Sequence, residues 1–177
     1  MRSCERYDKR SIVLHWATAL LIGLLWLSAQ FIDFFPKGPS RWNMLGLHMV
    51  MGVTLGLLIV ARIAWRRSSR SFRPSTGAGG SAALARGLHL LLYALVVCTV
   101  LLGLWNAWAR GEHVFELFQI PAFDPADKAI RKWAGNQHKL VANTLLLLSI
   151  AHAAMGIAHH VFFNDGVLRR MLPERTQ

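Results

Sequence analysis

Histidines lie inside the long apolar stretches of this chain, where an ionisable side chain is costly and usually functional. His138 and His152 stand fourteen residues apart in the last stretch. In an α-helix that spacing rises about 21 Å and turns the second side chain only about 40° from the first. One helix could then present an imidazole near each surface of a hydrocarbon core about 30 Å thick. Because imidazoles are axial ligands of haem iron, the spacing predicts two stacked haems that relay electrons across a membrane.

Two other histidines supply ligand partners at matching depths. His15 lies about one turn inside the start of the first apolar stretch, and His48 lies slightly deeper inside the start of the second. In an up-down arrangement these depths fall in opposite leaflets, which predicts the pairs His48 with His138 and His15 with His152. The chain lacks a CxxCH attachment motif, so both haems are expected to be b-type. Two layers about 20 Å apart argue against a single zinc or copper centre, whose ligands share one shell.

Two further histidines leave alternatives open. His89 lies near the same membrane surface as His15, and it could replace His15 or His152 as a ligand, or instead bond a propionate, a loop carbonyl or water. His159 is seven residues beyond His152, at the level of the lipid headgroups. It could donate a hydrogen bond to a quinone, or it could form an interfacial pair with His160 that has no specific role.

Hydropathy places these histidines in membrane-spanning helices. The 177 residues are 54% hydrophobic, which is too apolar for an ordinary soluble domain. Uncharged windows cover residues 11–32, 42–61, 87–109 and 140–164, and each is long enough to span a membrane. The predicted fold is all-α, an integral membrane four-helix up-down bundle in a single domain, residues 1–177, with spans at about 12–32, 43–65, 86–108 and 136–163. Asn136 is expected to cap the fourth helix.

Basic residues indicate the orientation of this bundle. The N-terminal tail, the 62–86 connection and the C-terminal tail hold thirteen of the 20 lysines and arginines. Because basic loops resist translocation, both termini are predicted to be cytoplasmic, in a multi-pass protein of a bacterial inner membrane. The formal charge of +11 is then a topology signal, and nothing else in the sequence indicates a nucleic-acid partner.

The predicted periplasmic side carries a group of cations before and at the start of the fourth span: Lys128, Arg131, Lys132 and Lys139, with Arg41 near the second helix. Such a group would attract an anion to the outer haem and raise its encounter rate. Lys139 is the preferred member because it adjoins His138. The alternative is an amphipathic loop helix, partly neutralised by Asp124 and Asp127. The whole segment 110–133 is expected to cap the bundle, with His113 solvated in it.

The chain resembles the bacterial cytochrome b561 family, whose members are small four-helix dihaem membrane proteins. The resemblance covers essentially the whole sequence and rests on the segments IVLHWATALL, NMLGLHMVMGV, HLLLYALVV, NQHKLVANTLLLLSIAHAAMGIAHHVFF and LRRMLP. It implies haem ligation by His15, His48, His138 and His152, in agreement with the depths of these residues.

One branch of this family is superoxide oxidase, and the length and layout here are similar to it. The resemblance implies an enzyme that passes electrons from periplasmic superoxide through two haems to ubiquinone near His159. A rival function is a cytochrome b subunit that links a partner dehydrogenase or hydrogenase to the quinone pool, which predicts a docking surface. A rival of another class is a haem-free membrane packing or carrier protein, whose histidines are only polar helix contacts.

Overall fold

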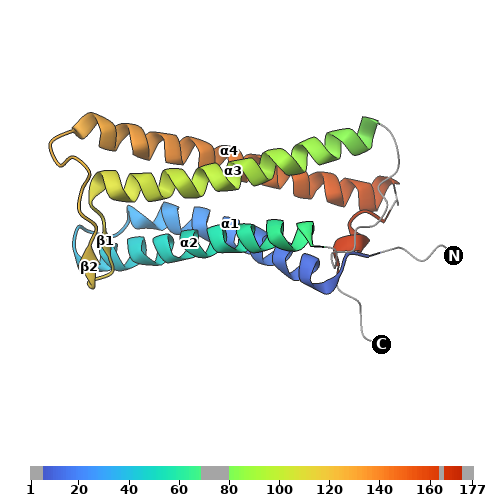
Figure 1. Cartoon of the computed structure of the whole chain (residues 1–177), viewed down its shortest axis with the longest axis horizontal. Helices are drawn as coiled ribbons and strands as arrows, with labels where there is room; N and C mark the ends of the chain where they lie inside the picture. The colour runs from blue at the N-terminus through green and yellow to red at the C-terminus, as the bar shows by residue number, and fades with distance from the viewer. Residues whose placement is uncertain (1–5, 69–79, 164–165, 173–177) are drawn as a thin grey trace.

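Four long helices form the molecule. The structure is a computed structural model, which describes residues 6–68, 80–163 and 166–172. The helices run alternately in opposite directions (Figure 1), and they are α1 (Lys9–Ile32), α2 (Pro39–Arg67), α3 (Gly80–Arg110) and α4 (Lys128–Ala158). α1 packs mainly on α2 and α3 mainly on α4, while contacts between α2 and α3 join the two pairs. The predicted four-helix bundle is confirmed.

The two ends of the described chain meet at one end of the bundle, which we call the terminal end (Figure 1). The chain leaves α4 through a π-helix (His159–Phe163) and then forms a short 3-10 helix (Arg169–Met171). The backbone N–H of Tyr7 donates to the carbonyl of Arg170 at 3.1 Å. The indole of Trp16 donates to the carbonyl of Met171 at 2.8 Å, so the C-terminal segment is tied to the start of α1.

A short antiparallel hairpin closes the opposite end, which we call the hairpin end. Its strands are β1 (His113–Val114) and β2 (Phe118–Gln119), and the sequence analysis did not predict them. Phe115 at the turn has a positive φ of 54°. Gly46 of α2 leaves room for this turn, since a Cβ there would lie 2.8 Å from the Phe115 ring.

Two expectations for this end are corrected. His113 is not simply solvated, because its ring stacks on that of Trp42 with 4.2 Å between the centroids. α4 begins at Lys128 and not near Asn136, because the Asp127 carboxylate accepts hydrogen bonds from the first-turn backbone N–H groups and caps the helix there. Asn136 therefore lies within the helix.

Interior residues recur every seven positions on three helices, an interval of about 10.5 Å along the axis that returns to nearly the same face. They form three layers, which from the hairpin end to the terminal end are His48, Gly103 and His138; Leu55, Val96 and Leu145; and Arg62, His89 and His152. The middle layer is buried, and with Ile59 it makes the hydrophobic core. The fold therefore separates two polar layers by an apolar one.

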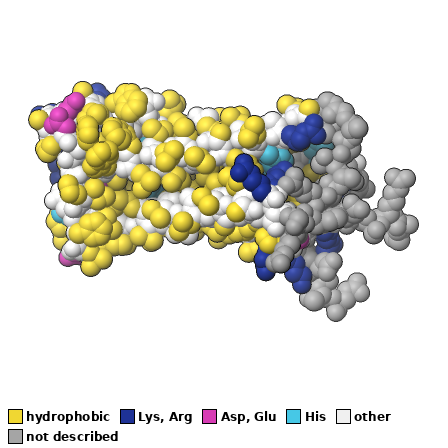
Figure 2. Space-filling view, in the orientation of Figure 1, with side chains coloured by type: hydrophobic (Ala, Val, Ile, Leu, Met, Phe, Trp, Pro, Cys, Tyr) yellow, Lys and Arg dark blue, Asp and Glu magenta, His cyan; other side chains and the backbone are white. Residues whose placement is uncertain are grey.

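The outer surface is that of a membrane protein. Each of the four helices is long and apolar enough to cross a membrane. Large apolar side chains in mid-helix are exposed, for example Leu57 (66%), Leu101 (60%) and Leu147 (67%). Figure 2 shows hydrophobic side chains over the middle of the molecule and Lys and Arg gathered toward the terminal end. Lipid, which is as apolar as these side chains, can cover such a belt.

Candidate functional site

His48 and His138 face each other across the hairpin-end layer. Their ring centroids are 6.3 Å apart and the ring planes lie at 85°. His48 Nδ1 lies 2.8 Å from the hydroxyl of Ser28 on α1. That hydroxyl donates its own proton to the carbonyl of Leu25, so it accepts from the Nδ1–H of His48. The Nε2 atom of His48 then carries no proton and is available as a ligand.

His138 is held in the same tautomer by α3. Its Nδ1 lies 3.1 Å from the carbonyl oxygen of Thr99, which can only accept a hydrogen bond. Gly103, one turn further along α3, lets the imidazole lie against the helix backbone, since a Cβ there would be 3.1 Å from His138 Cε1. Hydrogen bonds of this kind orient a ligating imidazole and raise its basicity.

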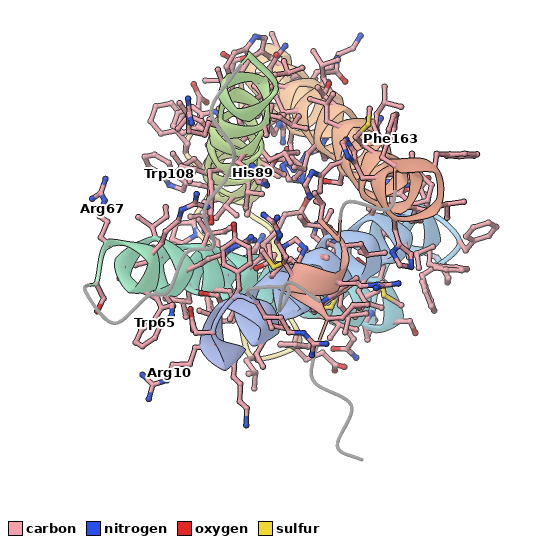
Figure 3. The ribbon with its side chains drawn as sticks, turned by 90° about the vertical axis from the view of Figure 1, so that its right-hand side faces the viewer. Arg10, Trp65, Arg67, His89, Trp108 and Phe163 are labelled. Atoms are coloured by element: carbon pink, nitrogen blue, oxygen red, sulfur yellow. The ribbon has the colours of Figure 1, made fainter. Side chains whose placement is uncertain are left out.

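The terminal-end layer holds three histidines. His15 of α1 and His152 of α4 have ring centroids 6.3 Å apart and planes at 81°. His89 of α3 also contacts His152, with 5.2 Å between centroids, and its Nδ1 donates to the carbonyl of Ala85. Figure 3, which views the bundle from the terminal end, shows His89 on the side of α3 that faces the other helices.

The ring separations test whether one iron fits between each pair. A metal–imidazole bond of about 2.0–2.1 Å, plus about 1.1 Å from the nitrogen to the ring centroid, places two trans imidazoles about 6.3 Å apart. Both the His48–His138 pair and the His15–His152 pair have this separation. His89 is about 1 Å too close to His152 for the same arrangement.

Two glycines follow His48 on α2 at intervals of four residues, and their surroundings differ. A Cβ added at Gly52, one turn from His48, would meet nothing within 4 Å, so space is open beside the hairpin-end pair. Gly56 instead packs closely on Val100, and it serves helix contact. Within the described ranges, no group of three or more His, Cys, Asp or Glu residues is arranged to hold a metal ion directly.

Arg62 is a member of the terminal-end layer, and the sequence alone had left open whether Arg62 or Arg86 pairs with a haem propionate there. Its guanidinium NH2 lies 3.0 Å from His15 Nδ1, and its Cζ lies 5.2 Å from the centroid of the Tyr93 ring. Arg62 follows His48 by fourteen residues, the spacing that separates His138 from His152. This interval predicts the position of Arg62, because fourteen residues of helix place it at the depth of the terminal-end layer and on the same face of α2 as His48.

Cations also gather at the hairpin end, around a surface pocket of about 380 Å³ that we call the basin. It is lined by Arg110, Glu112, Lys128, Arg131, Lys132 and Asn136. Arg110 is fixed by a hydrogen bond from its Nε to Asn106 Oδ1 at 2.9 Å, and its guanidinium lies over Gly135 of α4. Four cations against one carboxylate make the basin electropositive, beside the helix turn that precedes His138.

Two cations expected in this group lie elsewhere. Lys139 is exposed and does not line the basin, because it lies about 10.5 Å further along α4 than the basin residue Lys132; its charge acts on Asp33 instead. Arg41 donates to Asp33 at 2.8 Å and to the carbonyl of Ile32 at 3.0 Å, so it ties α2 to the end of α1. The hydrogen bond from Arg41 lowers the pKa of Asp33 below its usual value of 3.8.

The predicted quinone residue, His159, lies where α4 changes to the π-helix. Its ring is 5.1 Å from that of Phe163 on the same turn. The neighbouring His160 has a buried Nδ1 without a hydrogen-bond partner in the described structure. π-Helical turns often occur at functional positions, and this one places two imidazoles beyond His152 at the terminal end.

Comparison with known proteins places this architecture in a family. The family description "Prokaryotic cytochrome b561" matches residues 6–174, which is nearly the whole chain. The chain belongs to the prokaryotic cytochrome b561 family. This cytochrome is therefore a membrane haem-b electron-transfer protein, and the predictions of its family, its four-helix fold and its multi-pass location in a bacterial inner membrane are confirmed.

Three relatives of this cytochrome are similar over almost their full lengths. Cytochrome b561 homolog 1 of Escherichia coli (strain K12) is 30% identical over 175 residues, covering 97% of this chain and 99% of the relative. Cytochrome b562 of Cereibacter sphaeroides is 27% identical over 178 residues, covering 96% of each. The probable superoxide oxidase CybB of Yersinia pestis is 25% identical over 177 residues, covering 97% of this chain and 98% of the relative.

Proposed function

We propose that this cytochrome is a dihaem superoxide:ubiquinone oxidoreductase. His48 with His138 would hold one haem b, and His15 with His152 would hold the other. Bound haem supplies one-electron chemistry, whose potential is tuned by the axial ligands, their hydrogen bonds and burial. The ring separation of 6.3 Å in both pairs supports this ligand set over one that includes His89.

The basin is the observation that carries the choice of superoxide. Arg110, Lys128, Arg131 and Lys132 surround it at the hairpin end, and Gly135 beneath the Arg110 guanidinium is three residues from His138. A cation-lined concavity concentrates a small anion and raises its encounter rate. Superoxide arriving there would lose one electron and leave as dioxygen; no bond to iron would be needed, because His48 and His138 would both hold the iron.

Charge distribution supports the direction of this reaction. Thirteen of the 20 lysines and arginines belong to the segments that the sequence analysis assigns to the cytoplasm, and the described parts of these segments lie at the terminal end. The basin would then open to the periplasm. At the terminal end, His159 would donate a hydrogen bond to ubiquinone. Two superoxide anions supply two electrons, and with two protons from the cytoplasm they convert one quinone to quinol and release two dioxygen molecules.

The similarity to the Yersinia pestis protein named probable superoxide oxidase supports the same assignment. The names of the Escherichia coli and Cereibacter relatives specify no substrate, so the rival of an electron-transfer subunit with a partner dehydrogenase needs a direct test. That rival predicts haems that superoxide does not reduce.

The test uses the purified full chain in lipid vesicles that contain ubiquinone. Superoxide is generated enzymatically, and haem reduction, quinol formation and dioxygen release are measured. We expect two haems per chain and two superoxide anions consumed per quinol. Haems that are reduced by dithionite but not by superoxide would overturn the proposal and favour a protein donor. A protein without haem would contradict both functions.

A variant tests the part played by the basin. Replacing Lys128, Arg131 and Lys132 together by Gln removes three of its four cations while leaving its shape. We expect the rate with superoxide to fall about tenfold at low salt and to lose most of its dependence on ionic strength. Lys37→Gln is the matched control, because Lys37 is an exposed cation of the hairpin-end loop outside the basin. Equal rates in both variants would show that the basin does not guide superoxide.

A further inference from the structure

Arg62 is a cation within a membrane span, and in the described part of the chain no carboxylate pairs with it. Its contacts are the His15 imidazole at 3.0 Å and the face of the Tyr93 ring at 5.2 Å. The side chain is half-buried among α1, α2 and α3. A charge in such surroundings is costly unless an opposite charge accompanies it. The terminal-end layer thus lacks an anion.

Hydrogen bonding leads to the same conclusion. A guanidinium has no acceptor, so in the contact with His15 it must donate to Nδ1. A neutral imidazole that binds iron through Nε2 carries its proton on Nδ1 and cannot accept this bond. Arg62 therefore needs another acceptor whenever His15 acts as a ligand. Carboxylates are the acceptors that guanidinium groups bind most strongly.

Tyr93 supplies a second donor at the same place. Its ring lies beneath the Arg62 guanidinium, and its hydroxyl is buried without a hydrogen-bond partner among the described residues. A buried hydroxyl without a partner is destabilising unless a ligand or water completes its hydrogen bond. Tyr93 also follows His89 by one helical turn, so it lies on the wall of α3 that bounds the terminal-end layer.

The two histidine layers differ in the groups that lie beside their candidate ligands. At the hairpin end the Nδ1 atoms of His48 and His138 both donate to oxygen atoms, which raises ligand basicity and favours oxidised iron. At the terminal end the corresponding position on α2 is Arg62, whose positive charge favours the reduced state. Helix α2 thus contributes a candidate ligand, His48, to the hairpin-end layer and a cation, Arg62, to the terminal-end layer.

We propose that Arg62 and Tyr93 bind a propionate carboxylate of the haem in the terminal-end layer, and that Arg62 raises the reduction potential of that haem. The inference rests on the proposed ligand pair His15 and His152. A higher potential at the terminal end would favour electron transfer away from the basin. Arg62 and Tyr93 would recognise an anionic oxygen group, and a lipid phosphate has the same chemistry as a haem propionate. The second measurement below distinguishes the propionate from the lipid phosphate.

The first measurement is a redox titration of the purified haem-loaded protein, followed by haem absorbance. Arg62→Gln should lower the potential of one haem only. At a fixed applied potential, its ratio of reduced to oxidised haem should fall about tenfold, which corresponds to about 59 mV for one electron. Arg62→Lys should retain most of the effect, and Tyr93→Phe should cause a smaller fall in the same direction.

Arg67→Gln is the matched control. Arg67 is an exposed arginine in the last turn of α2, and Figure 3 shows it pointing away from the bundle. Its replacement should leave both potentials unchanged. Two unchanged potentials in Arg62→Gln, or equal shifts in both haems, would overturn the proposal.

The second measurement identifies the anion. Haem-depleted protein is reconstituted with haem or with its dimethyl ester, whose propionates carry no charge. Arg62→Gln should weaken the binding of haem at the terminal end about tenfold but leave the binding of the ester unchanged. Equal weakening of both would exclude the propionate, and dependence on anionic lipid would assign the contact to a headgroup.

These outcomes are distinguishable from failure of the proposed function. If superoxide reduces the wild-type protein but Arg62→Gln shifts neither potential, the function stands and this inference is wrong. If the wild-type protein binds haem only at the hairpin end, the ligand pair of the proposed function is wrong. Wild-type protein with two haems that superoxide cannot reduce would leave the Arg62 measurements valid.

Discussion

Gly103 offers a sharp test of the hairpin-end histidine pair. A Cβ added at this position would lie 3.1 Å from His138 Cε1 and 3.4 Å from His138 Nδ1. The imidazole would have to move by a few tenths of an ångström, away from α3. That movement stretches its hydrogen bond to the carbonyl of Thr99, which is already 3.1 Å long. Gly103→Ala should therefore disturb a ligand without touching the iron site directly.

The expected magnitude follows from that bond. Loss of a single hydrogen bond costs about 1 kcal/mol, which corresponds to about fivefold weaker haem binding at the hairpin end. Alanine is also a better helix former than glycine by about 1 kcal/mol, so the stability of the haem-free bundle should not fall. Gly103→Val should weaken haem binding further, because its branched side chain meets the same ring.

The assay compares haem transfer from each variant to an excess of a haem-accepting protein, with thermal unfolding measured in parallel. Gly87→Ala is the matched control on the same helix, because a Cβ there would meet nothing within 4 Å. Faster loss of one haem from Gly103→Ala alone is the expected result. Identical haem retention in the two variants would refute the role assigned to the close packing of His138 on α3.

Three further predictions concern the histidines and one ion pair. His138→Ala should lose the hairpin-end haem and keep the other, while His152→Ala should do the reverse, as measured by haem-to-protein ratio; equal loss in both variants would contradict the pairing. His89→Ala should keep two haems, because its ring lies 5.2 Å from that of His152, and loss of one would make it a ligand. The hydrogen bond from Arg41 lowers the pKa of Asp33, so their pair should stabilise the fold above about pH 4 and lose that contribution as the pH falls through the lowered pKa. Thermal unfolding of Asp33→Asn against pH should lack this component, and an unchanged pH profile would contradict it.

The sequence by itself determined the four spans and the depth of each histidine. Hydropathy acts over a local window, and helical rise converts residue number into depth, so neither requires knowledge of the neighbours. The pairs His48 with His138 and His15 with His152 were predictable on those grounds, and the structure brings both pairs together. Their role as haem ligands stays a prediction.

Tertiary packing decided which side chains complete each layer. The interval of fourteen residues from His48 to Arg62 was visible in the sequence, but an arginine near a helix end ordinarily extends to the membrane surface. Only the placement of α1 and α3 shows Arg62 against His15 and Tyr93. The ring separation that favours His15 over His89 as the partner of His152 is likewise a distance between helices. Residue spacing within one helix cannot predict such a distance.

The hairpin end shows the same division. Sequence counting placed the cations at the start of the fourth span, but which of them share a pocket depended on where α4 begins and how it packs on α3. Because α4 begins at Lys128, its first two turns carry Lys128, Arg131 and Lys132 beside Arg110 of α3, whereas Lys139 lies about 10.5 Å further along the helix than Lys132 and outside the basin. Composition thus determined that this end is cationic, while the start of α4 and its packing against α3 determined which cations share one site.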